Sequence, residues 1–303
     1  MNLNGVFTAL ITPFDRSGRP ALEVLEPLLR AQEAAGVDGV VIGGTNGEAV
    51  SMSVAERCEL LDRAMELKGD LSIIAGTGAA SITDAKMLTQ HASQSGAIAA
   101  LVLPPFYYKK TVASGLEAYY RSISAVSKIP MLLYHIPQLS YTPISFDLLG
   151  RLSKVPNVVG IKDSSGMHDR VLSILDRLPR MSVFEGDERF IQSSAKAGSA
   201  GVISGIGNAW PNLVTAAFRQ VGRPEGDAAQ DKLSRLCETL GQYPPIAVIK
   251  TVASWAGLPF AYVRPPLRDL TKEETAELKE KLEEAGLTPQ PISLKNPAAN
   301  GKI

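Results

Sequence analysis

Short apolar runs alternate with longer amphipathic stretches along most of the chain. The runs are nearly continuous in apolar and β-branched residues and show little alternation with polar ones. Such runs are typical of strands that are buried on both faces, as in a parallel sheet. The pattern predicts eight strands, over Gly5–Ile11, Val37–Ile42, Leu71–Ala75, Ala97–Leu103, Pro130–Tyr134, Val155–Ile161, Ser182–Glu185 and Ala200–Ile203.

The stretches between these runs have the length and the amphipathic pattern of helices. Ser53 is followed three residues later by Glu56, which indicates a capping box at one helix start, and Ser81 with Asp84 resembles it. Eight strand–helix units in succession predict a (β/α)8 TIM barrel. Helices are expected, for example, over Val54–Lys68, Ile82–Gln94, Ser114–Ser127 and Met167–Leu178.

A doubly wound sheet is the rival fold for such a pattern. It usually has fewer strands, and its dinucleotide-binding form carries a glycine-rich turn after the first strand. The Gly76-Thr77-Gly78 segment follows the third run and is too short for that fingerprint. The pattern therefore favours the barrel.

The strand pattern stops at about residue 222, and only helical stretches follow. We expect helices over Gly226–Gly241, Pro245–Ala256 and Thr271–Ala285. The chain then divides into a barrel with the active site, residues 1–225, and a C-terminal helical extension, residues 226–303. The Pro- and Asn-containing segment from about residue 287 predicts a flexible, frayed tail.

The composition narrows the class of protein. The 31 Lys and Arg residues balance 31 Asp and Glu residues, which argues against nucleic-acid binding. The two cysteines cannot form a disulfide scaffold and fit a reducing compartment. No apolar run approaches the roughly 18 residues of a membrane span, and the first residues do not resemble a signal peptide. We expect a cytoplasmic protein with no membrane partner.

The strand ends are the places to look for chemistry, because a (β/α)8 barrel has its active site at the carboxyl ends of its strands. The sixth run is followed by Lys162, which is expected to project into the barrel mouth between apolar walls. An amine that is partly removed from water loses its proton more readily and can attack a carbonyl carbon. The alternatives are a lysine that reaches solvent and one that pairs with Asp163.

Tyr134 ends the fifth run and is expected at the same mouth, one strand away from Lys162. A phenol there can carry a proton to or from a carbinolamine or a substrate hydroxyl. Packing in the top layer of the barrel is the alternative for Tyr134. His135 points to the other side of the strand and is expected to pack or to support the site.

Two loops also border the predicted mouth. Gly43–Glu48 follows the second strand, and its exposed N–H groups could hold a carboxylate, although an ordinary loop is equally consistent. Pro104–Lys110 follows the fourth strand. Its prolines and aromatic residues predict a stiff, bulky loop beside the mouth or at a subunit contact. Asp187 and Glu188 follow the seventh strand, where a role as helix caps is favoured over contacts with substrate hydroxyls.

The sequence predicts no metal site. The three histidines, His91, His135 and His168, have no ligand spacing with cysteines or acidic residues. A nucleotide-binding loop and a serine nucleophile elbow are also missing from the sequence.

Taken together, these clusters resemble the dihydrodipicolinate synthase / N-acetylneuraminate lyase family of class I aldolases. The pairing of a Tyr-X-Ile-Pro strand end with a Gly-Ile-Lys-Asp strand end is specific, and the Gly-Thr-X-Gly-Glu loop adds to it. The resemblance covers most of the chain: Thr12-Pro13-Phe14, Gly43–Glu48, Pro105–Tyr108, Tyr134–Pro137, Gly160–Lys162, Val202–Ser204 and Val263–Leu267.

The resemblance implies catalytic roles for four residues. Lys162 would form a Schiff base with the keto carbon of pyruvate or another 2-oxo acid. Tyr134 would relay protons, with Thr45 hydrogen-bonded to it. Tyr107 would complete the relay from the neighbouring subunit.

The resemblance also implies how the substrate is held and how the protein assembles. Thr45 and Asn46 would bind the substrate carboxylate, and the Ile203 backbone would line the site. No metal or organic cofactor would be needed, because the covalent Schiff base on the lysine does the chemistry. The resemblance further implies a homotetramer made of two tight dimers.

One departure from the family pattern bears on the substrate. Leu139 stands where dihydrodipicolinate synthases carry an arginine that grips the second substrate, and leucine cannot bind a carboxylate in that way. His135 and Gln138 also depart from the usual sialic-acid lyase pattern. The sequence therefore favours an aldolase acting on a 2-oxo acid, such as a 2-keto-3-deoxy acid. A 2-keto-3-deoxy sugar acid dehydratase, a 4-hydroxy-tetrahydrodipicolinate synthase and a non-catalytic binding protein remain as alternatives.

Overall fold

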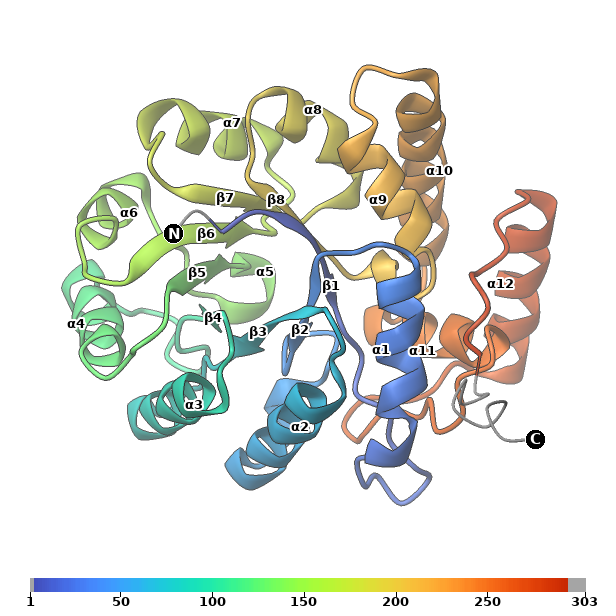
Figure 1. Cartoon of the computed structure of the whole chain (residues 1–303), viewed down its shortest axis with the longest axis horizontal. Coiled ribbons are helices and arrows are strands. Elements are labelled where there is room, and N and C mark those ends of the chain that lie inside the picture. The colour runs from blue at the N-terminus through green and yellow to red at the C-terminus, as the bar shows by residue number, and fades with distance from the viewer. Residues whose placement is uncertain (1–2, 294–303) are drawn as a thin grey trace, which may run out of the picture.

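The computed structural model describes residues 3–293 and shows a closed barrel of eight parallel strands (Figure 1). Each strand pairs with its neighbour in sequence, and β1 closes the barrel against β8. The predicted (β/α)8 TIM barrel is therefore confirmed. The strands are β1 (Gly5–Ala9), β2 (Gly39–Ile42), β3 (Ser72–Gly76), β4 (Ala99–Val102), β5 (Met131–His135), β6 (Val158–Asp163), β7 (Ser182–Glu185) and β8 (Gly201–Ser204).

The interior of the barrel is a packed core. Phe7 on β1 and Phe184 on β7 meet edge to face with ring centroids 5.9 Å apart. Leu132 and Tyr134 on β5 belong to the same cluster of buried residues. Because side chains alternate along a strand, this arrangement fixes which residues of each strand face the mouth.

Helices surround the barrel, and the predicted ones are present with shifts of one to a few residues at their ends. Ser53 and Glu56 form the predicted capping box, and the Ser81 hydroxyl accepts from the Asp84 N–H. The α-helices of the barrel are α1 (Leu25–Ala34), α2 (Val54–Leu67), α3 (Ile82–Ser95), α4 (Ala113–Ser124), α5 (Pro137–Ser140), α6 (Phe146–Leu152), α7 (His168–Arg177), α8 (Ile191–Lys196) and α9 (Pro211–Arg219). Short 3-10 helices are η1 (Leu22–Val24), η2 (Ala49–Ser51), η3 (Glu188–Phe190) and η4 (Ile206–Asn208).

The three helices predicted after residue 222 are present, with ends shifted by one or two residues. Helices α10 (Pro224–Leu240), α11 (Pro245–Trp255) and α12 (Lys272–Glu284) lie together at one side of the barrel in Figure 1. Leu233, Val252 and Leu278 from these helices share one buried cluster with residues of β1 and α1. The division of the chain at residue 225 stays a prediction.

The prediction of a frayed tail from residue 287 is wrong for the residues that the structure describes. The N–H groups of Gln290 and Ile292 donate to the carbonyls of Ala209 and Ala256, and the Trp210 indole donates to the Thr288 carbonyl at 3.0 Å. These bonds hold the segment against the barrel. The remainder of the predicted tail, residues 294–303, lies outside the described residues.

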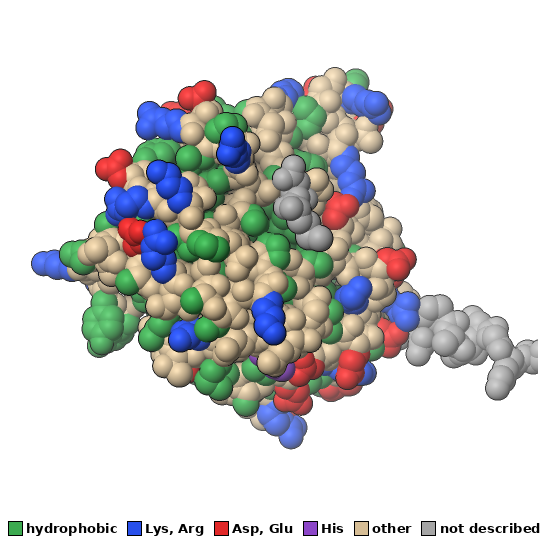
Figure 2. All heavy atoms as spheres, turned by 60° about the vertical axis from the view of Figure 1, so that its left-hand side comes forward, with side chains coloured by type: hydrophobic (Ala, Val, Ile, Leu, Met, Phe, Trp, Pro, Cys, Tyr) green, Lys and Arg blue, Asp and Glu red, His purple; other side chains and the backbone are tan. Residues whose placement is uncertain are grey.

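Charged side chains of both signs are interspersed on the face of the molecule that Figure 2 presents. This distribution follows the balanced composition of the chain. None of the helices found between residues 3 and 293 has the length and apolar character that crossing a bilayer requires.

Candidate active site

Lys162 and Tyr134 lie side by side at the mouth of the barrel. They are paired residues on the neighbouring strands β6 and β5. The Lys162 Nζ donates to the Tyr134 Oη at 3.4 Å and lies 4.5 Å from the centre of its ring. Both side chains are buried, with 5% of each residue exposed. The structure therefore brings together the two strand-end residues that the sequence analysis selected.

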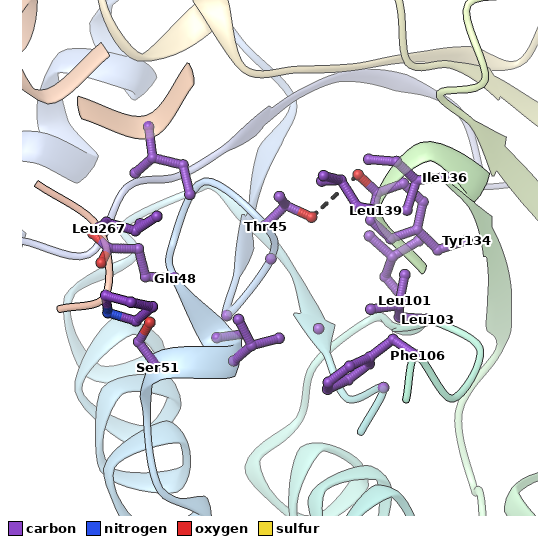
Figure 3. A pocket seen from close by; sticks show the side chains of 18 residues that line it. Thr45, Glu48, Ser51, Leu101, Leu103, Phe106, Tyr134, Ile136, Leu139 and Leu267 are labelled. Atoms are coloured by element: carbon purple, nitrogen blue, oxygen red, sulfur yellow. Dashed lines mark hydrogen bonds between the residues drawn. The ribbon is translucent and has the colours of Figure 1, made fainter. Parts of the chain in front are cut away.

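Thr45 extends this contact into a line of three polar groups. Its Oγ1 lies 3.3 Å from the Tyr134 Oη, and either oxygen can donate, as Figure 3 shows. The Tyr134 hydroxyl thus touches both the Lys162 amine and the Thr45 hydroxyl. This arrangement can move a proton between the amine and the loop that follows β2.

Asp163 does not pair with Lys162. The Arg170 Nε donates to its Oδ2 at 2.8 Å, and the N–H and hydroxyl of Ser165 donate to its Oδ1. The Asp163 carboxylate therefore binds Arg170 and Ser165. In the part of the chain that the structure describes, no ion pair involves Lys162.

The loop after β2 ends in a buried glutamate, Glu48, whose contacts hold the loop in place. Glu48 has a left-handed backbone, with φ of 53°. Its carboxylate accepts from the Lys250 Nζ at 2.5 Å and from the Arg264 N–H at 3.0 Å. Lys250 on α11 is itself fully buried. The C-terminal extension therefore fixes the loop that carries Thr45, a role that the sequence analysis missed.

The carboxylate-binding residues expected from the resemblance lie nearby. Asn46 is half-buried and packs against the turn after β8, where a Cβ on Gly205 would lie 2.3 Å from its Nδ2. Ile203 on β8 is fully buried in the barrel core. Their contacts with a substrate stay a prediction.

The two acidic residues after β7 have different roles. Asp187 caps η3, because its side chain accepts from the Arg189 N–H at 3.1 Å, as predicted. Glu188 instead binds the turn after β8, accepting from the Ser204 hydroxyl and the Gly205 N–H, each at 2.7 Å. The prediction of a cap is therefore wrong for Glu188, because its Oε1 accepts from groups of the turn after β8.

Tyr107, on the loop after β4, is exposed to solvent in the single chain. It is 77% exposed and packs edge to face on Tyr108 with ring centroids 5.5 Å apart. The expectation that it completes the relay of another subunit stays a prediction. His135, as expected, packs behind the site: its Nδ1 accepts from the Ile144 N–H, and burial lowers its pKa to about 4.

A cavity of about 320 Å³ opens from Tyr134 and Thr45 toward solvent. Leu139 on α5 lines this cavity and is 55% exposed at its mouth. Figure 3 shows the two groups of side chains that face each other across it. The lining residues are Gly43, Gly44, Thr45, Glu48, Ala49, Val50, Ser51, Gly76, Gly78, Leu101, Leu103, Phe106, Tyr134, Ile136, Leu139, Ile246, Pro266 and Leu267.

Between residues 3 and 293, no three His, Cys, Asp or Glu side chains gather closely enough to hold a metal ion. That the chemistry needs no metal or organic cofactor stays a prediction.

Known proteins resemble the chain over nearly its whole length. The model of the dihydrodipicolinate synthetase family matches residues 2–285. A protein of Chloroflexus aurantiacus named an uncharacterized DapA-like lyase is 36% identical over 94% of this chain and 98% of its own. The 4-hydroxy-tetrahydrodipicolinate synthase of Methanococcoides burtonii is 32% identical over 93% of this chain and 98% of its own.

Solved structures show the same likeness. The dihydrodipicolinate synthase of Acinetobacter baumannii, complexed with pyruvate, superposes with a TM-score of 0.89 at 29% identity, covering 94% of this chain and 99% of its own. The dihydrodipicolinate synthase of Aquifex aeolicus gives a TM-score of 0.88 at 31% identity, with the same coverage.

Proposed function

Because the chain belongs to the dihydrodipicolinate synthetase family, we propose that it is a Schiff-base-forming lyase of the aldolase type, acting on pyruvate or another 2-oxo acid. One observation carries the proposal: the buried Lys162 amine lies 3.4 Å from the hydroxyl of Tyr134, a residue that lines the cavity of about 320 Å³. An amine in that position can attack a carbonyl and has a proton donor and acceptor within reach.

The reaction begins with attack of the Lys162 amine on the keto carbon. The carbinolamine loses its hydroxyl as water, with a proton from Tyr134, and an iminium forms. The iminium accepts an electron pair, so either C3 loses a proton to give an enamine or the C3–C4 bond breaks. Thr45 contacts Tyr134 and returns the proton, while the loop N–H groups and Asn46 hold the carboxylate.

Two other reactions run through the same Schiff base. The Methanococcoides burtonii relative is named a 4-hydroxy-tetrahydrodipicolinate synthase, which keeps that activity as a second candidate. Leu139 at the cavity mouth speaks against it, because a leucine cannot bind a carboxylate. A 2-keto-3-deoxy acid dehydratase differs only in losing a hydroxyl in place of a carbon fragment. Efficient condensation of pyruvate with aspartate semialdehyde would select the synthase.

The proposal includes a homotetramer in which Tyr107 reaches a neighbouring site, and a cytoplasmic location. The exposure of Tyr107 and of the adjacent Tyr108 supports a protein contact at this loop. The proposed reaction uses no metal or organic cofactor, so dialysis against a chelator should leave activity unchanged.

Trapping of the Schiff base tests the proposed function. The protein is incubated with pyruvate, reduced with borohydride and weighed by mass spectrometry, and the modified peptide is sequenced. We expect one reduced pyruvate adduct per chain, located on Lys162, and none in Lys162→Ala. No mass gain, or an equal gain in the variant, would overturn the proposal.

A further inference from the structure

Three lysine or arginine residues are buried among those that the structure describes: Arg57, Lys162 and Lys250. Buried cations are rare unless they are paired or serve a site, because removing a charge from water is costly. Lys250 pairs with Glu48, and Lys162 is the proposed nucleophile. Arg57 on α2 is 8% exposed and takes part in no ion pair between residues 3 and 293. Its buried charge therefore requires an explanation.

The hydrogen bonds of Arg57 go to the end of β3. Helix α2 lies against β2 and β3 on the outside of the barrel (Figure 1). The Arg57 Nη2 donates to the carbonyls of Gly76 at 2.8 Å and of Gly78 at 3.1 Å, and the buried Nε has no hydrogen-bond partner among the described residues. A neutral donor could satisfy two carbonyls, and the carbonyls offset only part of the cost of burying a full charge. These bonds alone therefore do not account for a cation at this position.

The loop that carries Thr45 lies directly beyond these carbonyls. A Cβ on Gly43 would lie 3.4 Å from the Gly76 oxygen, which is the same oxygen that accepts from Arg57. A Cβ on Gly76 would lie 3.1 Å from the Gly44 nitrogen. Gly43, Arg57 and Gly76 also border one small cavity. A single carbonyl group therefore separates the guanidinium from the start of the loop.

This loop offers donors for an anion. Among the hydrogen bonds between residues 3 and 293, none has the N–H of Thr45 or of Asn46 as its donor. Successive free N–H groups in a turn form a concavity that binds anions. The Thr45 hydroxyl contacts Tyr134, which contacts the Lys162 amine. In an iminium on Lys162, the substrate carboxylate is attached to the carbon that bonds Nζ, so it is held within reach of this loop.

The other charges beside the loop are paired. The Glu48 carboxylate accepts from the Lys250 amine, and the Arg264 guanidinium pairs with Glu56. Among the described residues, Arg57 therefore supplies a positive charge at this place that no carboxylate neutralises at close range. A full charge at roughly 10 Å changes the binding of an anion by about tenfold at the effective dielectric constant of a protein.

We propose that Arg57 is a specificity-determining residue: its charge, placed behind the loop after β2, favours substrates that carry a carboxylate next to the keto group. The inference rests on the proposed function. It assigns the preference for an anionic substrate to a residue that takes part in no step of the proposed reaction. The guanidinium stays charged at neutral pH, because burial lowers its pKa only to about 10.

Pyruvate and pyruvamide are matched probes for this charge, because the amide has the size and shape of the carboxylate and is neutral. For each compound, exchange of the methyl protons in D2O at pH 7 is followed by NMR to give kcat/KM. The quantity that is compared is the ratio of the pyruvate value to the pyruvamide value. A variant that only distorts the loop lowers both values, whereas loss of the charge lowers the value for pyruvate.

Variants of α2 assign the preference to the charge. Arg57→Met keeps a long side chain without charge and should lower the ratio by about tenfold. Arg57→Lys keeps a charge and should keep most of the ratio. Arg63→Met, at an exposed position of the same helix, is the matched control and should leave the ratio unchanged. If Arg57→Met does not fold, Arg57→Gln, which keeps an amide donor for the carbonyls, takes its place with the same expectation.

The outcomes separate this inference from the proposed function. Exchange of pyruvate by the wild type, combined with an unchanged ratio in Arg57→Met, would overturn the inference alone. A ratio in Arg57→Lys as low as that in Arg57→Met would also overturn it, because the shape of the guanidinium and not its charge would then be responsible. Absence of both exchange and a borohydride-trapped adduct in the wild type would overturn the proposed function and the inference with it.

Discussion

At the scale of single residues, the Tyr134 hydroxyl connects the Lys162 amine to the loop after β2. It lies 3.4 Å from the Lys162 Nζ and 3.3 Å from the Thr45 Oγ1. Both distances are long for hydrogen bonds, so they contribute little to stability in the free protein. Catalytic hydrogen bonds often tighten only when the substrate is bound. The hydroxyl is therefore expected to matter for rate much more than for folding.

The variant Tyr134→Phe tests whether the hydroxyl affects the rate much more than the stability. It keeps the ring and its packing and removes only the proton carrier. We expect kcat to fall by roughly 10²–10⁴-fold, with a melting temperature lowered by no more than about 4 °C. Tyr120→Phe is the matched control, since that buried hydroxyl has no hydrogen-bond partner among the described residues and lies outside the barrel. Wild-type kcat in Tyr134→Phe would contradict the relay.

Glu185 at the end of β7 makes stability depend on pH. Burial raises the pKa of its carboxyl from 4.5 to about 7, and this effect outweighs the hydrogen bonds from Ser194 and from the N–H groups of Gly186 and Asp187. The folded protein therefore holds the proton more tightly than the unfolded chain does. Its contribution to stability is complete below pH 4.5 and is lost as the pH rises toward 7.

Glu185→Gln removes this dependence while it keeps an oxygen for the backbone N–H groups. Between pH 5 and pH 8, the unfolding free energy of the wild type should fall relative to that of the variant by roughly 2–3 kcal/mol. Urea unfolding of both proteins across this range measures the difference. If the unfolding free energies of the two proteins changed equally with pH, Glu185 would not titrate between pH 5 and pH 8.

At the scale of elements, the C-terminal extension and the active-site loop form one unit. Lys250 on α11 is fully buried, contacts the Phe14 ring at 4.3 Å from its centre and pairs with Glu48. Its Nζ also donates to the Tyr262 carbonyl at 2.7 Å. A buried pair of this kind costs much more to break than it contributes when intact.

Lys250→Met breaks the pair and leaves the Glu48 carboxylate buried. The unfolding free energy should fall by about 3–5 kcal/mol, and kcat/KM should fall because the Thr45 loop loses its anchor. Adding Glu48→Gln removes the stranded charge and should restore part of the stability. Urea unfolding and steady-state kinetics measure both effects, and an unchanged urea midpoint in Lys250→Met would contradict this assignment.

The sequence predicts the strands well because both of their faces are apolar, but it misplaces their ends. The sixth run is expected over Val155–Ile161, whereas β6 spans Val158–Asp163. Asn157 turns the chain with φ of 67° before the strand begins. Lys162 and Asp163 continue the strand although they are polar: both pair with residues of β5, and the Asp163 carboxylate also binds Arg170.

Contacts between distant residues lie beyond the reach of sequence patterns. Glu48 and Lys250 are 202 positions apart, and their pairing depends on how α11 meets the loop after β2. The composition of the segment near residue 290 predicts a frayed tail. Its backbone N–H groups nevertheless donate hydrogen bonds to the carbonyls of Ala209 and Ala256. The sequence analysis identified Lys162 and Tyr134 because each lies at the end of an apolar run, and the carboxyl ends of the strands of a barrel converge at one mouth.

At the scale of the whole molecule, the loop after β4 leaves large apolar side chains in solvent. Tyr107, Tyr108 and Val112 are 77%, 70% and 67% exposed. Exposed apolar groups of this kind mark contact sites. If Tyr107 enters the site of a second subunit, each site takes Lys162 from one chain and Tyr107 from the other.

Mixing two inactive variants tests this sharing. A dimer of Lys162→Ala with Tyr107→Phe contains one site with both natural residues and one with neither. Random reassembly makes half of the dimers mixed, so about a quarter of wild-type activity should return. Sedimentation of the same samples should show the tetramer. If Tyr107 acts within its own chain, no mixed dimer regains a complete site and activity stays at the level of the parent variants.

The most direct test of the central claim follows the methyl protons of pyruvate by NMR in D2O. Exchange at C3 requires both the iminium on Lys162 and its enamine, and it needs no second substrate. The wild-type protein should replace the methyl protons with deuterium catalytically, and Lys162→Ala should show only the rate of the buffer. Exchange at the buffer rate in the wild type, or equal exchange in Lys162→Ala, would contradict the account.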